Sequence, residues 1–309
     1  MRLISIFGIR ARESVLWCSM IGLGVMAPVM ARAQQSCQAE GRLMPVKGLP
    51  EASGVAVSRK SADVLWSHND SGEPVLVAVG TDGETRGRVW IAGAAVEDWE
   101  DIDVGPCPGG SCIYIGDIGD NNAKRGSLTI YRVPEPDPAA ERSPRAESMR
   151  LTFPNGPRDA EALVVLPNGS MYIVTKGERS AAMLYRAGSF TNGTTVRLEP
   201  IATIVDANQR GGVSRQDRIT GASASRDGHW IVLRTLGAVM FYRTSDLESG
   251  NAREVLRYSL GSVGERQGEG VAFADGGTIW LSSEGGGAGR PGTIARLSCT
   301  LPDNRNPKF

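Results

Sequence analysis

Histidine is almost absent from this chain, and neither sign of charge is in excess. His68 and His229 are the two histidines among 309 residues, and 34 lysines and arginines balance 34 acidic residues. This balance does not favour a nucleic-acid polymer or an anionic membrane as a partner. The scarcity of histidine disfavours zinc and copper, which prefer imidazole and thiolate ligands. A serine-hydrolase triad would depend on His68 alone, and the Gly-x-Ser-x-Gly motif is missing.

Cysteine is also scarce, but its count predicts disulfides. Cys37, Cys107, Cys112 and Cys299 lie beyond the first 33 residues, and four cysteines allow three pairings. Cys107 and Cys112 flank a turn sequence, so we expect them to close a small loop. Cys37 and Cys299 would then join the two ends of the remaining chain, which suits a closed ring. Disulfides of this kind are typical of exported proteins.

Residues 1–33 have the pattern of a secretory signal peptide. Arginines precede an apolar run from about residue 15 to residue 30, and Ala31-Arg32-Ala33 has the small-x-small form of a cleavage site. An uncleaved membrane anchor is the alternative, but glycines and a proline inside the run favour the signal peptide. We therefore expect a periplasmic or secreted protein with one mature domain over residues 34–309 and no membrane contact after cleavage.

A short apolar strand that opens with an oxygen-bearing residue occurs five times. These residues are Ser53, Glu100, Glu161, Thr220 and Glu269, at intervals of 47, 61, 59 and 49 positions. A turn and a second strand follow each of them. Self-similarity at this period, built from short strands, is typical of a β-propeller.

The chain divides into five blades of four strands, which predicts an all-β fold with almost no helix. The predicted strands are 54–58, 64–68, 75–79 and 86–91; 99–104, 112–117, 128–133 and 148–153; 160–166, 171–176, 183–187 and 196–204; 219–225, 230–235, 239–243 and 252–258; and 268–274, 278–283 and 293–298. The last blade lacks one strand, which the segment at about 38–46 can supply. This closes the ring without a free edge, so we expect a monomer.

The five oxygen-bearing residues should converge at one end of the axis. The loops after the second strands and those before the first strands reach the same face. The charged residues that these loops carry include Asp70, Asp98, Asp117, Asp120, Arg158, Asp159, Lys176, Glu178, Asp217, Arg218, Arg234, Arg266 and Glu284. Carboxylates that share one site raise each other's pKa, and calcium, which takes six to eight oxygen ligands, would relieve this. We therefore predict a Ca²⁺ site at Ser53, Glu100, Glu161, Thr220 and Glu269. The alternative is that these side chains satisfy backbone amides at strand ends.

The pattern resembles the five-bladed calcium-dependent apyrases, which are secreted nucleotidases of animals and blood-feeding arthropods. In that family one oxygen ligand per blade lies at the start of the innermost strand, in the order serine, glutamate, glutamate, serine, glutamate. The same order occurs here, with Thr220 in place of the second serine. Segments 99–102 and 268–271 are also similar, and the resemblance covers essentially the whole mature chain. It implies the propeller scaffold and the axial calcium site.

The leading hypothesis is a metal-dependent hydrolase of phosphate esters or anhydrides such as nucleotides. Asp70, Asp117 or Asp120 would act as the base toward a water molecule. Lys176 and Arg234 would neutralise phosphate oxygens, with Arg158 and Arg218 as further candidates.

Two alternatives stay open. A calcium-dependent lactonase or esterase would use asparagines such as Asn69, Asn121 and Asn122 at the metal. A non-catalytic propeller would use calcium to stabilise the ring, as any ligand specific to the native state does, and its top loops would bind a partner.

Overall fold

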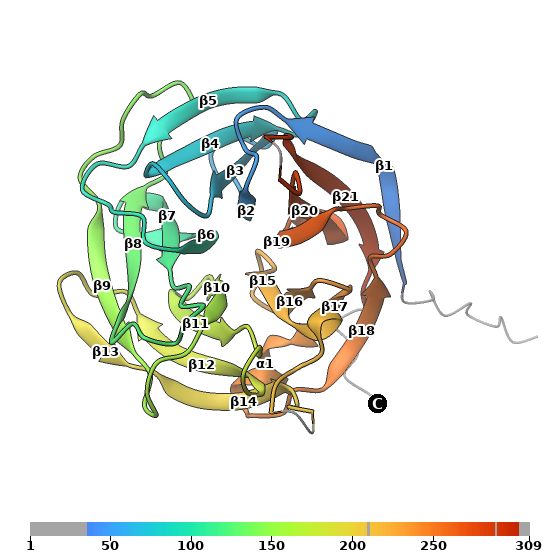
Figure 1. Ribbon diagram of the computed structural model, residues 1–309. Helices are drawn as coiled ribbons and strands as arrows, with labels where there is room; N and C mark the ends of the chain where they lie inside the picture. The colour runs from blue at the N-terminus through green and yellow to red at the C-terminus, as the bar shows by residue number, and fades with distance from the viewer. Residues whose placement is uncertain (1–35, 209–210, 288, 303–309) are drawn as a thin grey trace, which may run out of the picture. The chain divides into compact units, whose positions relative to one another are not determined.

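Antiparallel sheets repeat five times around a central axis (Figure 1) in a computed structural model that describes residues 36–208, 211–287 and 289–302. The predicted all-β, five-bladed propeller is therefore confirmed. The predicted signal peptide lies outside the described residues. In the described ranges, no helix has the length and apolar character needed to span a membrane.

Each blade runs from an inner strand beside the axis to an outer strand. Blade 1 contains β2 (Ala52–Val57), β3 (Val64–Asn69), β4 (Val75–Gly80) and β5 (Thr85–Trp90). Blade 2 contains β6 (Trp99–Cys107), β7 (Gly110–Asp117), β8 (Leu128–Pro134) and β9 (Glu147–Thr152). Blade 3 contains β10 (Ala160–Val165), β11 (Ser170–Thr175), β12 (Ala182–Ser189) and β14 (Glu199–Val205). Blade 4 contains β15 (Ile219–Ala224), β16 (Trp230–Thr235), β17 (Ala238–Arg243) and β18 (Glu254–Ser259).

Blade 5 is built from both ends of the described chain. It contains β19 (Gln267–Phe273), β20 (Thr278–Glu284), β21 (Gly292–Thr300) and, as its outer strand, β1 (Ser36–Val46). Cys37 lies opposite Cys299 in the β1–β21 register, and the two form a disulfide with a Cα–Cα distance of 4.0 Å. Cys107 and Cys112 form the second disulfide. Both predicted pairings are confirmed.

The outer strand of blade 3 differs from its prediction as one strand over 196–204. Residues 195–197 instead form β13 (Thr195–Arg197), which pairs in parallel with the outer edge of β9 in blade 2. Leu198 is buried between the two strands, and its amide donates to the carbonyl of Thr152. After β12 of blade 3 the chain thus covers the free edge of blade 2 before it returns to form the outer strand of blade 3. A short helix, α1 (Thr244–Glu248), follows β17.

Apolar side chains fill the space between successive blades in five clusters. Because neighbouring blades cover both of its faces, an inner strand is nearly all buried, and β10 buries all six of its residues. Hairpin turns such as the one at Gly169, whose φ is 84°, reverse the chain at the blade ends.

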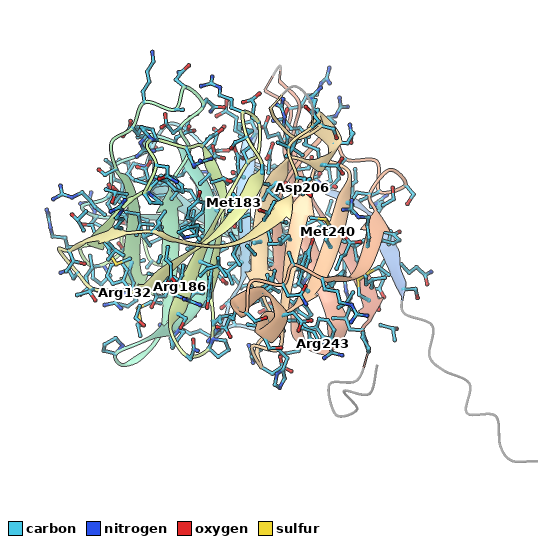
Figure 2. All side chains as sticks on the ribbon, turned by 90° about the horizontal axis from the view of Figure 1, so that it is seen from below. Arg132, Met183, Arg186, Asp206, Met240 and Arg243 are labelled. Atoms are coloured by element: carbon cyan, nitrogen blue, oxygen red, sulfur yellow. A yellow bond between two sulfur atoms is a disulfide. The ribbon has the colours of Figure 1, made fainter. Side chains whose placement is uncertain are left out.

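The strand order gives the ring two distinct faces. We call the face with the loops between second and third strands the top face, and the face with the turns between first and second strands the bottom face. Figure 2 shows the propeller from the side, with Asp206 toward the top face and Arg132, Arg186 and Arg243 toward the bottom face. The first strand of every blade begins at the top face, so the predicted site residues belong there.

Candidate metal centre

A β-bulge interrupts the pairing of first and second strands in every blade, at the position of the predicted ligand. In β6 the pairing passes from Trp99 to Asp101 while β7 advances one residue, so Glu100 is the extra residue. Glu161 in β10 and Thr220 in β15 are extra in the same way. The shifts in β2 and β19 span the positions of Ser53 and Glu269. Bulges redirect side chains and are common beside active sites. The same bulge at the start of the inner strand thus repeats in every blade around the axis.

Three carboxylates come close together at the top of the axis. Ligand oxygens of Glu100, Asp159 and Glu161, which we call the acidic cluster, all lie within 4.8 Å of one another. Asp159 directly precedes β10, and its proximity to Glu161 in the sequence is the signal that could have identified it as a ligand. It was expected only as a loop residue of the top face.

Glu100 is the most exceptional member of the acidic cluster. Its residue is 8% exposed, and among the described residues its carboxylate has no hydrogen-bond or ion-pair partner. Burial raises the pKa of Glu100 well above its ordinary value, and the nearby charges of Glu161 and Asp98 raise it further. Burial likewise raises the pKa of Glu161 well above its ordinary value. A buried carboxylate without a partner is costly, and a bound cation would remove this cost.

Lys176 supplies positive charge at the acidic cluster. Its Nζ atom lies 2.5 Å from Glu161 Oε1 and 3.6 Å from Asp159 Oδ2. Burial alone would lower the pKa of Lys176, but the charges of Glu161 and Asp159 outweigh it and raise that pKa. Lys176 therefore contacts the carboxylates of the predicted metal site. It does not lie at the rim of that site, where it was expected to neutralise phosphate oxygens.

The hydroxyl ligands predicted at the axis make bonds between blades. Ser53 Oγ donates to the carbonyl of Glu100 at 2.7 Å, and Thr220 Oγ1 donates to the carbonyl of Glu269 at 2.8 Å. These bonds fit the alternative in which strand-end residues satisfy backbone groups. A donating hydroxyl keeps lone pairs, so these bonds leave both oxygens able to ligate a cation.

Glu269 lies near the acidic cluster without joining it. Gln267 Nε2 donates to its Oε1 at 2.9 Å and also to Glu284. Burial raises the pKa of Glu269 to about 7, and the charge of Glu284 adds to this. The five predicted ligands thus divide into two members of the acidic cluster, one neighbouring carboxylate and two hydroxyls that join blades.

Two of the predicted bases have structural partners. Asp117 accepts the amides of Glu97 and Asp98 and forms an ion pair with Arg125 at 2.9 Å. Asp120 accepts the amides of Lys124 and Arg125. Asp117 therefore joins the loop before β6 to the loop between β7 and β8, and Asp120 holds the latter loop in shape.

Asp70 is the third predicted base and has more freedom. It follows β3 on the top face, and its Oδ1 atom is buried without a hydrogen bond. Burial, with the charge of Glu51, raises the pKa of Asp70 to about 6. This is the range in which a carboxylate can exchange a proton near neutral pH.

Arg234 has an environment that does not support phosphate binding. The residue is 0% exposed. Its Nη1 atom donates to the carbonyls of Gly270 and Ser282 at 2.8 Å, and its Nη2 atom forms an ion pair with Glu265. The guanidinium ties blade 4 to blade 5. The sequence did not predict this buried role, because an arginine at the end of a strand is equally consistent with an exposed charge at the rim of the site.

A pocket of about 230 Å³ opens on the top face beside the acidic cluster. Asp159 belongs to both, and the pocket is also lined by Asn121, Arg158, Arg179 and Ser180. Arg158 Nη1 donates to Ser180 Oγ at 2.9 Å, while its buried Nε atom has no partner. The pocket therefore brings arginine side chains next to a site that suits a cation.

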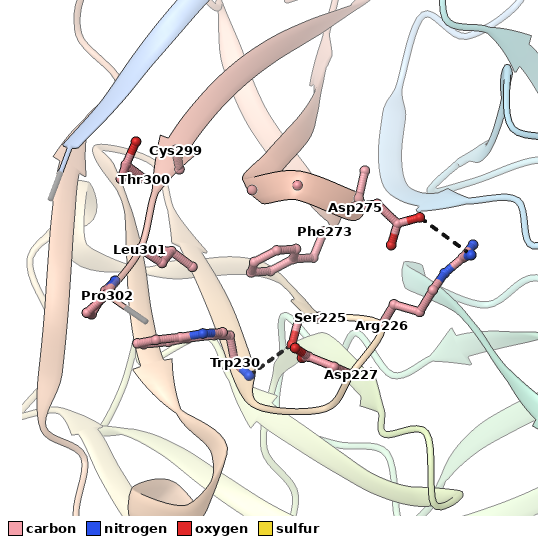
Figure 3. Close-up of a pocket in the computed structure, with 13 residues that line it drawn as sticks. Ser225, Arg226, Asp227, Trp230, Phe273, Asp275, Cys299, Thr300, Leu301 and Pro302 are labelled. Carbon is pink, nitrogen blue, oxygen red and sulfur yellow. Dashed lines mark hydrogen bonds and ion pairs between the residues drawn. The ribbon is translucent and has the colours of Figure 1, made fainter. Parts of the chain in front are cut away.

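A larger cavity, of about 640 Å³, lies on the bottom face (Figure 3). Trp230, Phe273 and Leu301 give it an apolar wall, and Arg226 pairs with Asp275 across its rim at 3.5 Å. Ser225 also donates to Asp227, and a short 3-10 helix at Asp275–Gly277 forms part of the lining. The acidic cluster lies on the other face.

No protein-family model matches the chain, and no curated protein matches its sequence. Among solved structures, the PQQ-bound aldose sugar dehydrogenase from Streptomyces coelicolor aligns with a TM-score of 0.53 and 13% identity, over 87% of this chain and 99% of that chain. The likeness shows a β-propeller. A gluconolactonase from Xanthomonas campestris aligns with a TM-score of 0.46 and 11% identity, over 86% and 100%. Such identities show the fold alone, and the second match adds nothing to the function. The apyrase resemblance stays a prediction.

The donors present suit a hard divalent cation. All three members of the acidic cluster offer oxygen, the ligand atom that calcium and magnesium require. Calcium tolerates irregular geometry and can complete its shell with water, which a cluster open to the top face allows. Of the asparagines considered for a lactonase-type site, Asn69 accepts the amide of Glu51 and contacts the carbonyl of Gly48. Asn121, in contrast, lines the pocket beside the acidic cluster.

Proposed function

We propose that this protein binds calcium at the acidic cluster and hydrolyses phosphate esters or anhydrides, with nucleotides as the first candidates. The observation that carries the proposal is Glu100, a buried carboxylate without a hydrogen-bond or ion-pair partner in the described structure. Glu100 belongs to the acidic cluster, and this cluster shares Asp159 with a pocket that is also lined by arginine. Bound calcium would polarise a phosphoryl oxygen and offset the charge that develops on it.

The residues around the pocket have separate roles in this proposal. Arg158 and Arg179 hold the anionic group, since guanidinium matches phosphate oxygens with a planar fork. Asp70, which lies on the top face outside the pocket lining, accepts the proton of the attacking water in this proposal, because Asp117 and Asp120 are already engaged by backbone amides. Glu100, Asp159 and Glu161 hold the cation, and Lys176 balances part of their charge when no cation is bound.

The two disulfides support a location outside the reducing cytoplasm. Within the proposal the protein acts in the periplasm or after secretion, as a monomer, on a small phosphorylated molecule. Neither a nucleic-acid polymer nor a membrane is needed as a partner.

The test is phosphate release by the purified protein over a panel of nucleoside di- and triphosphates, with calcium or with EGTA. We expect calcium-dependent release that Glu100→Gln abolishes. Glu97→Gln is the control, because that side chain lies on the same face and is 65% exposed. Calcium binding without release from any substrate would favour the non-catalytic propeller. Calcium-dependent opening of lactones instead would favour the lactonase.

A further inference from the structure

The backbone of Lys176 is fixed beside the acidic cluster by hydrogen bonds, whereas its side chain can move. It directly follows β11. Its amide donates to the carbonyl of Asp159 at 3.1 Å, and its carbonyl accepts the amide of Ile219 at 3.1 Å. These bonds connect the inner ends of blades 3 and 4. Movement of Lys176 is therefore a movement of its four-carbon side chain alone.

The ammonium group lies at the distance from Glu161 that a metal ion would take. Its Nζ atom is 2.5 Å from Glu161 Oε1, and calcium lies about 2.3–2.6 Å from its oxygen ligands. Two cations at these distances from one carboxylate oxygen would lie close together, and their like charges would repel. The ion pair with Lys176 therefore opposes metal binding at Glu161 unless the ammonium group moves away.

The side chain has a route away from the cluster. It is 20% exposed, so it can turn toward the top face without opening the core. Asn121 Oδ1 lies 3.5 Å from Nζ on this side. Asn121 lines the 230 Å³ pocket, as do the neighbours of Lys176 in sequence, Thr175 and Gly177. A displaced ammonium group would thus remain at the edge of the pocket.

We propose that Lys176 is a tethered internal cation that competes with calcium for the acidic cluster and thereby weakens calcium binding. This inference rests on the proposed function for the metal site, and it adds the residue that sets the affinity of that site. With the ammonium group in place, three carboxylates face one positive charge. The divalent ion must displace that group, so part of its binding free energy is lost in breaking the ion pair with Glu161.

The test is calorimetric titration with calcium chloride of the wild type, Lys176→Gln, Lys176→Arg and Lys124→Gln. We expect Lys176→Gln to bind calcium about tenfold more tightly, because the competitor is gone. Lys176→Arg keeps the charge and should stay close to the wild type. Lys124→Gln makes the same change of charge on an exposed residue of the same face, so it should not change the affinity.

Thermal melting gives a second readout that does not need activity. Without calcium, Lys176→Gln should melt below the wild type, because the carboxylates lose their counter-charge. With calcium it should gain more than the wild type gains, since the shift follows the ratio of ligand concentration to Kd. If this variant folds only with calcium, the dependence of its melting temperature on calcium gives the same Kd.

The outcomes separate the inference from the proposed function. Equal or weaker calcium binding by Lys176→Gln, while the wild type binds, would overturn the inference and leave the metal site in place. If neither the wild type nor any variant binds calcium, both the inference and the proposed function are overturned. Binding by Lys176→Gln alone would support the inference in its strongest form.

Discussion

Glu100 is 8% exposed, and its carboxylate has no hydrogen-bond or ion-pair partner in the described structure, where Lys176 acts on it only through its nearby charge. Replacing Glu100 should therefore have opposite effects with and without metal. Glu100→Gln should weaken calcium binding by about a hundredfold or more, since even groups behind the metal ligands contribute about 10–100-fold. In EDTA the same variant should melt above the wild type, because burial of a charge is relieved. Calorimetry and thermal melting in parallel measure both effects. A variant that loses stability in EDTA would show that Glu100 has a protein partner after all.

His68 should make the fold sensitive to acid. It is fully buried, its Nδ1 atom contacts the carbonyl of Asn69 at 2.9 Å, and its ring packs against Trp99. Burial lowers the pKa of His68 from 6.5 to about 4. The unfolded chain therefore binds the proton first, and the contribution of His68 is complete above pH 6.5 and lost as the pH falls toward 4.

The variant His68→Phe keeps a ring against Trp99 and removes the titration. We expect the free energy of unfolding of this variant to fall less than that of the wild type between pH 6.5 and 4, by about 3 kcal/mol. Urea unfolding at several pH values measures this difference. His229→Phe, at an exposed position, controls for the loss of an imidazole. Parallel stability curves for wild type and His68→Phe would contradict the assignment.

At the scale of strands, Asp101 joins three blades from its position in β6. Its Oδ2 atom accepts the amides of Leu163 in β10, at 3.0 Å, and Ala222 in β15, at 3.2 Å, while Oδ1 accepts the amide of Ile102. Blades 2 and 4 are not neighbours in the ring, so the bond to Ala222 reaches across the axis. The side chain closes the centre of the propeller below the acidic cluster.

Asp101→Asn should therefore destabilise the fold. Three amide donors need three acceptor sites, and an amide oxygen provides two where a carboxylate provides about four. At least one buried amide loses its partner, at a cost of about 1–3 kcal/mol. Equilibrium unfolding in urea measures the change, with Glu97→Gln as a surface control. An unchanged midpoint would show that these bonds contribute nothing net.

The strands were predictable because each has a clear local signature. Short apolar runs end at turn sequences, so the inner three strands of every blade fall close to their predicted positions. β13 was missed since its pairing depends on the exposed edge of β9 in another blade, which no local pattern contains. The same limit applies to the site. The bulges repeat with the sequence motif, and Asp159 lies two residues before Glu161. The contact of Lys176 with Glu161, in contrast, depends on the pairing of β10 with β11.

At the scale of the whole molecule, the two disulfides should differ in their effect. Cys37–Cys299 spans 262 residues and holds the strand that closes the ring, whereas Cys107–Cys112 spans five. Because loop entropy grows with length, Cys37→Ser with Cys299→Ser should cost about 2–5 kcal/mol. Cys107→Ser with Cys112→Ser should cost less. Chemical denaturation of the two double variants decides this, and a larger loss for the short loop would contradict it.

The ring closure itself was predictable from the sequence, because the strand missing from blade 5 could be supplied by the unassigned segment at about 38–46. The sequence did not show which polar residues hold the blades together. Arg234 and Asp101 are bonded across blades by side chains, and such partners become visible only when the ring is assembled.

The most direct measurement is an anomalous difference map from crystals grown with calcium, collected at long wavelength. We predict one peak at the top of the axis, about 2.3–2.6 Å from carboxylate oxygens of Glu100, Asp159 and Glu161, with the ammonium group of Lys176 withdrawn from Glu161. A map without a peak there at saturating calcium, with Lys176 still paired to Glu161, would contradict the metal site.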